Sequence, residues 1–136
     1  MIILKIRVSL VLTLIGILVT FCDNASNEVK TPGTILQSPN YPEEYDNNTD
    51  CVVKIRLEAG EIVSLEFLSF HIQQDWSCSL DFLEIRDGDS HNSKLRARIC
   101  TSAAPITSTG NKMYIRFHTN GEGTRKGFQI KVGAGI

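Results

Sequence analysis

The sequence lacks the short motifs that mark common catalytic sites. It contains no Gly-x-Ser-x-Gly nucleophile elbow, no His-Glu-x-x-His motif and no glycine-rich loop that would hold a phosphate group. The histidines His71, His91 and His118 lie at no spacing typical of metal ligands, and no two cysteines form a Cys-x-x-Cys pair. The sequence therefore predicts neither an enzyme nor a zinc site.

An excess of basic residues is also absent. The chain has 14 Lys and Arg against 15 Asp and Glu, a formal net charge of −1 at pH 7. A nucleic-acid-binding protein would show a basic patch or stripe, so we expect no nucleic-acid partner. After residue 22 there is no second long apolar run and no sustained 3.6-residue periodicity. These absences exclude a further membrane span and a helical fold.

The N-terminal end is typical of a secretory leader. Lys5 and Arg7 precede residues 8–21, an apolar run interrupted only by small residues, and no acidic residue appears before Asp23. The run is short for a permanent anchor, although an uncleaved anchor remains the alternative. Cleavage after Cys22 satisfies the small-residue rule with Thr20 at the −3 position, and cleavage a few residues earlier or later is also open. We thus predict a leader over 1–22, a flexible polar segment over 23–32, one domain over 33–136, and a secreted, extracellular protein with no membrane attachment after cleavage.

The domain itself shows the pattern of an antiparallel β-protein. Apolar and polar residues alternate in five segments: 53–57, 63–67, 83–86, 113–118 and 128–132. Such alternation puts one face of a strand in a core and the other in water. Turn-forming residues such as Gly60, Gly88 and Gly110 separate the segments. Many short strands with frequent turns predict a β-sandwich or barrel.

The cysteines suit an oxidising compartment. Cys78 and Cys100 bracket the 83–86 segment, and a bridge between them would stabilise the domain by roughly 3 kcal/mol. The only other partner for Cys51 is Cys22, which leader cleavage could remove. Asn47 begins an Asn-Asn-Thr sequon in a turn-rich loop, which makes it a candidate glycosylation site.

Taken in order, these residues resemble the CUB domain family. Residues 33–42 read Gly-Thr-Ile-Leu-Gln-Ser-Pro-Asn-Tyr-Pro, similar to the family's opening, and Tyr45 and Cys51 match its next landmarks. The segments 70–72, 78–88, 100–117 and 127–130 resemble the centre and the second half of the family pattern, so the resemblance runs from residue 33 to about residue 132.

The resemblance implies an all-β fold, a jelly-roll-like antiparallel sandwich of two sheets with about five strands each. It also implies two local disulfides, Cys78–Cys100 and, if Cys22 survives processing, Cys22–Cys51. Family members occur in complement proteases, tolloid-like metalloproteases, endocytic receptors and spermadhesins, where catalysis belongs to other domains. The resemblance thus implies a non-catalytic extracellular module that binds a protein partner. A fragment of a larger CUB-containing receptor or protease is the alternative.

Many CUB domains bind calcium through three acidic side chains in loops at one end. The corresponding positions here are Gln73, Asp81 and Asn120, so one of the three keeps its charge. The two amides offer oxygen atoms, and Asp75 or Glu122 could substitute, but calcium affinity falls as the number of carboxylates falls. We therefore expect a degenerate calcium site and no resident cofactor, with the Asp81 carboxylate held by loop N–H groups.

Two binding hypotheses follow. Trp76 lies in a polar loop, and tryptophan is enriched at protein-binding hot spots, although it could equally cover an edge of the core. Lys94, Arg96 and Arg98 alternate with Leu95, Ala97 and Ile99, so on a regular strand the three cations would share one face and could bind an anionic, heparin-like glycan. A solvated strand face is the alternative.

Overall fold

The computed structural model describes residues 17–23 and 28–135. It contains ten strands: β1 (Leu18–Thr20), β2 (Glu28–Val29), β3 (Ile35–Gln37), β4 (Asp50–Arg56), β5 (Ile62–His71), β6 (Phe82–Asp87), β7 (Lys94–Ile99), β8 (Ile106–Thr107), β9 (Lys112–His118) and β10 (Gly127–Gly135). Within the described residues there is no helix, and hence none long and apolar enough to cross a membrane.

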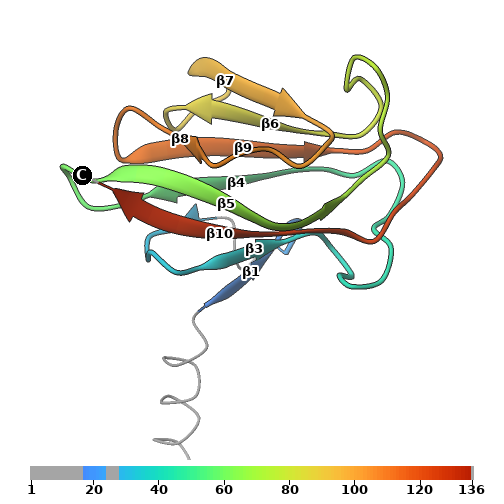
Figure 1. Ribbon diagram of the computed structural model, residues 1–136, viewed down its shortest axis with the longest axis horizontal. Helices are drawn as coiled ribbons and strands as arrows, with labels where there is room; N and C mark the ends of the chain where they lie inside the picture. The colour runs from blue at the N-terminus through green and yellow to red at the C-terminus, as the bar shows by residue number, and fades with distance from the viewer. Residues whose placement is uncertain (1–16, 24–27, 136) are drawn as a thin grey trace, which may run out of the picture.

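The strands form two five-stranded sheets that pack face to face (Figure 1). One sheet has the order β1-β3-β10-β5-β8 and the other the order β2-β4-β9-β6-β7. The pairs are antiparallel except for β1 with β3 and β2 with β4. The sandwich of two sheets with five strands each confirms the predicted all-β fold class.

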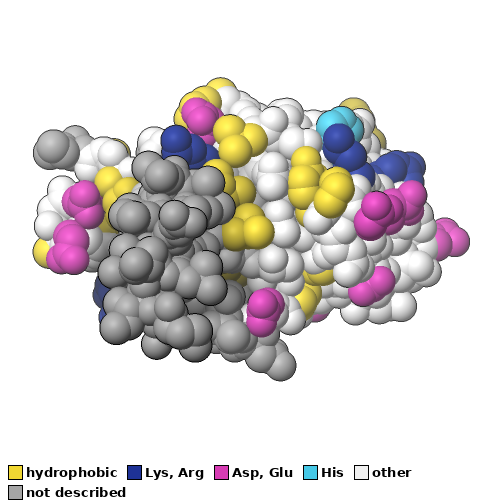
Figure 2. Space-filling view, turned by 90° about the horizontal axis from the view of Figure 1, so that it is seen from below, with side chains coloured by type: hydrophobic (Ala, Val, Ile, Leu, Met, Phe, Trp, Pro, Cys, Tyr) yellow, Lys and Arg dark blue, Asp and Glu magenta, His cyan; other side chains and the backbone are white. Residues whose placement is uncertain are grey.

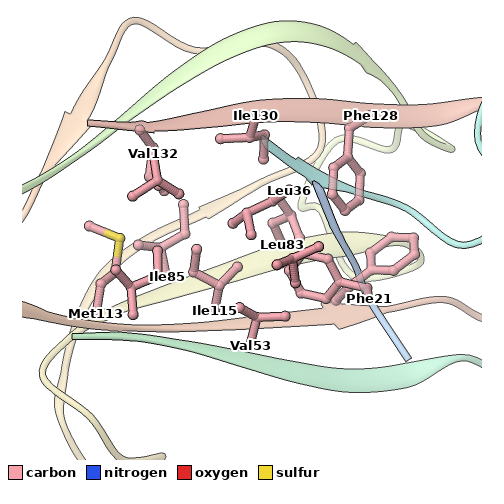
Figure 3. Packing of buried hydrophobic residues seen from close by; sticks show 14 of the residues in the cluster. Phe21, Leu36, Val53, Leu83, Ile85, Met113, Ile115, Phe128, Ile130 and Val132 are labelled. Atoms are coloured by element: carbon pink, nitrogen blue, oxygen red, sulfur yellow. The ribbon is translucent and has the colours of Figure 1, made fainter. Parts of the chain in front are cut away.

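The core is built from the inward-facing residues that the alternation identified. Val53, Leu83, Ile85, Ile115 and Ile130 are all buried, and they meet between the sheets in Figure 3. Their polar neighbours along each strand point outward because side chains alternate across a pleated strand. The alternation in the sequence therefore reports directly which face of each strand is buried.

The first strands lie inside ranges that the sequence assigned to a leader and to a flexible segment. β1 pairs with β3, and Phe21 is buried against Phe117 and Phe128 with edge-to-face rings. In β2, Val29 is buried and pairs with Ile55 of β4. The sequence hides both strands because β1 continues an apolar run and β2 has only two residues, too few to show a period.

Two disulfides close the fold. Cys22 is bonded to Cys51, and Cys78 is bonded to Cys100. The Cys78–Cys100 bridge confirms the pairing expected for an oxidising compartment and implied by the CUB resemblance, and the Cys22–Cys51 bridge was implied only if Cys22 survives processing. The Cys22–Cys51 bond ties the residues that follow β1 to the start of β4, so residues 18–22 are structural parts of the sandwich.

Candidate functional site

Three loops meet at one end of the sandwich, on the right of Figure 1: residues 38–49, 72–81 and 119–126. We call this surface the loop end. The loops bond to one another, since the Asn48 N–H donates to the Asn120 carbonyl at 2.8 Å and the Tyr45 N–H donates to the Arg125 carbonyl at 3.2 Å. The Gln73 N–H donates to the Tyr45 hydroxyl at 3.0 Å. The loop end is thus a cross-linked surface in which each loop is fixed by its neighbours.

Asp81 lies at the centre of these contacts. Its side chain is 0% exposed. Its Oδ2 accepts a hydrogen bond from the Tyr45 hydroxyl at 2.5 Å, and its Oδ1 accepts one from the Asn120 N–H at 2.9 Å. Burial, and next the hydrogen bond to Asp81, raise the pKa of Tyr45 well above its ordinary value, so the phenol remains a donor. A buried carboxylate is stable only when its oxygens are bonded in this way.

The structure brings the three predicted calcium positions together. The side-chain amide of Asn120 lies between Gln73, Asp81 and the Glu122 carbonyl. With its nitrogen turned toward them, it donates to Gln73 Oε1 at 2.9 Å and to Asp81 Oδ1 at 3.0 Å. The sequence indicated these positions but missed Tyr45 as the second partner of Asp81. The only signal for Tyr45 was its place as a family landmark.

These residues do not fit a calcium ion. Calcium takes six to eight oxygen ligands and its affinity depends on their charge. Here a single carboxylate is present among Gln73, Asp81 and Asn120, and both of its oxygens already accept hydrogen bonds from protein donors. In the part of the chain that the structure describes, no group of three or more His, Cys, Asp or Glu side chains is placed to hold a metal. Asp75 does not join the set, because its carboxylate bonds within its own loop.

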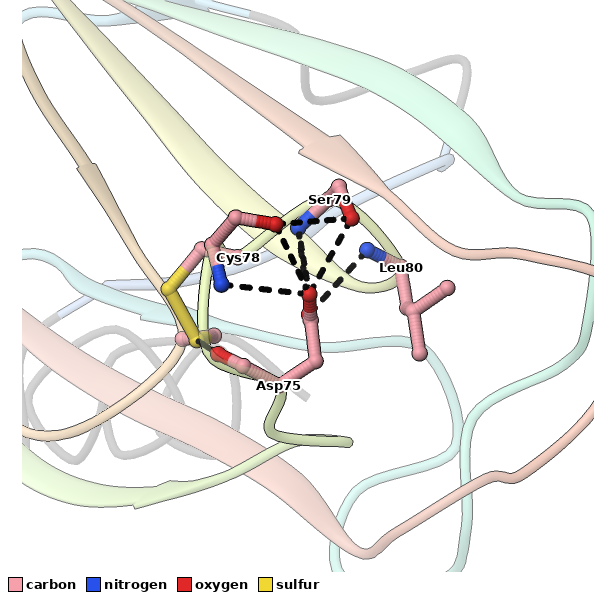
Figure 4. Close-up of a disulfide and its surroundings, with 6 residues drawn as sticks. Asp75, Cys78, Ser79 and Leu80 are labelled. Carbon is pink, nitrogen blue, oxygen red and sulfur yellow. Dashed lines mark hydrogen bonds between the residues drawn. A yellow bond between two sulfur atoms is a disulfide. The ribbon is translucent and has the colours of Figure 1, made fainter.

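Trp76 is the most exposed large apolar residue on the described surface, with its indole fully in solvent. Its loop is nevertheless held by hydrogen bonds to Asp75 and by a disulfide (Figure 4). The Asp75 carboxylate accepts hydrogen bonds from the N–H groups of Ser79 and Leu80, and the Cys78–Cys100 bond ties the loop to the end of β7. Partial desolvation of the Asp75 carboxylate acts to raise its pKa, but these hydrogen bonds outweigh it and hold the pKa below its ordinary value. Trp76 is thus presented to solvent and does not cover the core.

Acidic side chains surround this surface. The loops carry the exposed residues Glu43, Glu44, Asp46 and Glu122, and Figure 2 shows acidic groups gathered at the same end, with a few Lys or Arg side chains beside them. The exposed Asn47 lies there too, in the turn where the Thr49 hydroxyl donates to the Asp46 carbonyl at 3.0 Å. Its glycosylation stays a prediction. The turn that carries Asn47 lies beside the 119–126 loop, because the Asn48 N–H donates to the Asn120 carbonyl.

The structure separates the three cations of β7. The register of β6 and β7 shifts by one residue between Ile85 and Arg86, so that Ala97 pairs with Ile85 but Leu95 pairs with Arg86. Such a bulge breaks the strict alternation of faces. The expectation that Lys94, Arg96 and Arg98 share one face is therefore wrong.

The cations contact different groups. Arg98 bonds to Glu84 Oε2 at 3.0 Å and covers the Phe82 ring at 4.2 Å, on the outer face of its sheet. Arg96 reaches in another direction and donates from Nε to the Thr107 carbonyl of β8 at 2.9 Å. Lys94 and Arg96 line a shallow pocket with Thr107 and Asp87. At most two of the three cations can thus face one ligand in this pocket.

Comparisons with known proteins agree with the geometry. The CUB domain family matches residues 22–132. Human Tolloid-like protein 1 is 36% identical over 112 residues, covering 79% of this chain and 11% of the relative, and Bone morphogenetic protein 1 of Xenopus laevis is 41% identical over 105 residues, covering 76% and 15%. The chain therefore spans less than a sixth of the length of these two curated relatives. Cubilin of Canis lupus familiaris is 39% identical over 97 residues, covering 70% of this chain and 3% of the relative.

Among solved structures, the MASP-1 CUB2 domain bound to Ca²⁺ superposes with a TM-score of 0.70 at 27% identity, covering 79% of this chain and 96% of that one. The range matched by the family, residues 22–132, includes all four cysteines of the two disulfides of this chain. The chain belongs to the CUB domain family.

Proposed function

We propose that this chain is a secreted, non-catalytic module that binds an extracellular protein partner through its loop end, with Trp76 as the central anchor. The observation that carries the proposal is the full exposure of Trp76 on a loop held by Asp75 and by the Cys78–Cys100 bond. A large aromatic side chain on a rigid loop loses little conformational entropy on binding. CUB domains of the related proteases and receptors are extracellular interaction modules, which supports the same role here.

The test compares binding of the secreted protein to intact cells and to extracellular matrix, measured as saturable binding of a labelled chain. We expect Trp76→Ala to raise Kd by roughly 30-fold or more, the effect of losing a hot spot of about 2 kcal/mol. Leu68→Ala is the matched control, since Leu68 is a half-exposed apolar residue on β5, away from the loops. Equal binding by wild type and Trp76→Ala, with both folded by circular dichroism, would rule out the anchor.

We further propose that leader cleavage lies upstream of Ile17, so that the mature protein keeps β1 and Cys22. Cleavage after Cys22 would remove buried Phe21 and leave Cys51 without its partner. Mass spectrometry of the secreted protein tests this directly. A mature N-terminus at Asp23 would contradict it.

An anionic glycan is the second candidate ligand, through Lys94 and Arg96 in the shallow pocket between β7 and β8. The pocket also holds the Asp87 carboxylate, and Arg98 is engaged by Glu84. We therefore expect the protein to elute from heparin at low salt. Strong, salt-sensitive retention that is lost in a Lys94→Ser/Arg96→Ser variant would favour the glycan instead.

A further inference from the structure

The strongest unexplained feature of the loop end is the crowding of oxygen atoms around the Asn120 amide. One terminal atom of this amide lies 2.9 Å from Gln73 Oε1, 3.0 Å from Asp81 Oδ1 and 2.5 Å from the Glu122 carbonyl oxygen. An oxygen at that position would face three other oxygens. A nitrogen there has two hydrogens to donate among these acceptors, which favours the nitrogen as the atom that points inward.

Gly123 and Tyr45 help to hold two of these acceptors, the side chains of Gln73 and Asp81, in place. A Cβ atom on Gly123 would lie 2.5 Å from Gln73 Nε2, so the bare backbone at Gly123, with φ of +82°, makes room for the Gln73 amide. The other oxygen of Asp81 is turned toward the Tyr45 hydroxyl. The three acceptors therefore converge from two loops, 72–81 and 119–126, onto one donor.

We infer that the Asn120 amide nitrogen takes the place of a bound cation and makes the loop end independent of calcium. A cation would draw the same oxygens together from the 72–81 and 119–126 loops, and here a neutral donor does so. With a single negative charge in the set, a divalent ion would gain little by displacing this donor. The inference concerns the metal dependence of the loops and holds whichever partner they bind.

The substitution Asn120→Asp tests the inference because it changes almost nothing in shape. It replaces the inward nitrogen by an oxygen, which places a second carboxylate against Asp81 and two further oxygens. Repulsion of like charges should lower the melting temperature by several degrees in a chelator. Millimolar calcium should restore most of the loss, because two adjacent carboxylates now favour the cation.

The wild type should melt at the same temperature in calcium and in chelator, and should give no terbium luminescence sensitised by Tyr45. Asn48→Asp is the matched control, since Asn48 is exposed in the adjoining loop and adds the same charge to the same end. It should show neither the loss nor the recovery. Asn120→Ala removes the donor without adding charge, and should be destabilised with no response to calcium.

Two results would overturn the inference. The first is a wild-type melting temperature that rises by several degrees in calcium and loses this rise in Asp81→Asn. The second is an Asn120→Asp protein as stable in chelator as the wild type, which would show that the inward nitrogen is not needed. If Asn120→Asp does not fold, the calcium and terbium titrations of the wild type still decide the question.

Discussion

Phe21 shows whether residues 17–22 belong to the folded domain. Its side chain is 1% exposed, with ring centroids 6.2 Å from Phe117 and 5.4 Å from Phe128. Truncating a buried phenylalanine to alanine typically costs about 3–5 kcal/mol. The total stability of a small domain is about 5–15 kcal/mol, so Phe21→Ala should remove a large part of it.

The assay is urea unfolding followed by far-ultraviolet circular dichroism. Tryptophan fluorescence is unsuitable because Trp76, the only tryptophan, is already in water in the folded state. With a urea dependence of about 1.5 kcal/mol per molar, the midpoint should fall by roughly 2 M or more. Ile17→Ala is the control, since Ile17 is 48% exposed at the start of the same segment and should cost about 1 kcal/mol or less.

An unchanged midpoint for Phe21→Ala would refute the reasoning. It would mean that residues 17–22 add nothing to the core, as expected if the leader extends through Cys22. A large fall in the urea midpoint for both Phe21→Ala and Ile17→Ala would show instead that residues 17–22 stabilise the domain as a whole. The stability of the domain would then not depend on which of these side chains is buried.

Three further predictions concern the rest of the domain. A peptide map without reductant should link Cys78 to Cys100, and replacing both by alanine should cost roughly 3 kcal/mol; alkylation of either as a free thiol would contradict the bridge. Trp76→Ala should leave the free energy of unfolding in urea unchanged within about 0.5 kcal/mol, because the indole is fully exposed, and a loss of several times that size would place it in the core. The Arg116 guanidinium holds the pKa of Asp50 below its usual range, so the stabilisation from Asp50 is complete above about pH 4 and falls as the pH drops through that lowered value. Melting temperatures measured from neutral to strongly acidic pH should therefore fall less steeply for Arg116→Gln than for wild type, and parallel curves would show that this exposed pair contributes nothing.

The alternation of apolar and polar residues was enough to predict an antiparallel sandwich or barrel, and the CUB resemblance implied the sandwich. Segments such as 113–118 carry their orientation in the order of their side chains, because a strand has only two faces. The positions of the 72–81 and 119–126 loops follow from the order of the strands. The first loop joins β5 to β6 and the second joins β9 to β10, and these strands are neighbours in the two sheets. Gln73, Asp81 and Asn120 are therefore expected near one another.

Several features depended on contacts between residues far apart in the chain. The apolar run over 8–21 does not show that its last residues form a strand, because only pairing with β3 and burial of Phe21 against β9 and β10 separate β1 from the leader. The Cys22–Cys51 bond belongs to the same packing, and the retention of Cys22 in the mature protein stays a prediction.

Local pattern alone also could not place the side chains of β7 or the loop end. A one-residue register shift between β6 and β7 divides Arg96 from Arg98, although their spacing in the sequence is that of one strand face. Likewise the sequence shows that Asn120 stands where an acidic residue would be expected, but only the tertiary structure surrounds its amide with the oxygens of Gln73, Asp81 and Glu122. The sequence by itself thus determined the five strands with clear alternation, and its resemblance to the CUB family indicated the residues of the loop end. Tertiary packing decided that residues 18–22 pair into the sandwich, that the β7 cations face different ways and what holds the loops, because each of these depends on distances between residues that are remote along the chain.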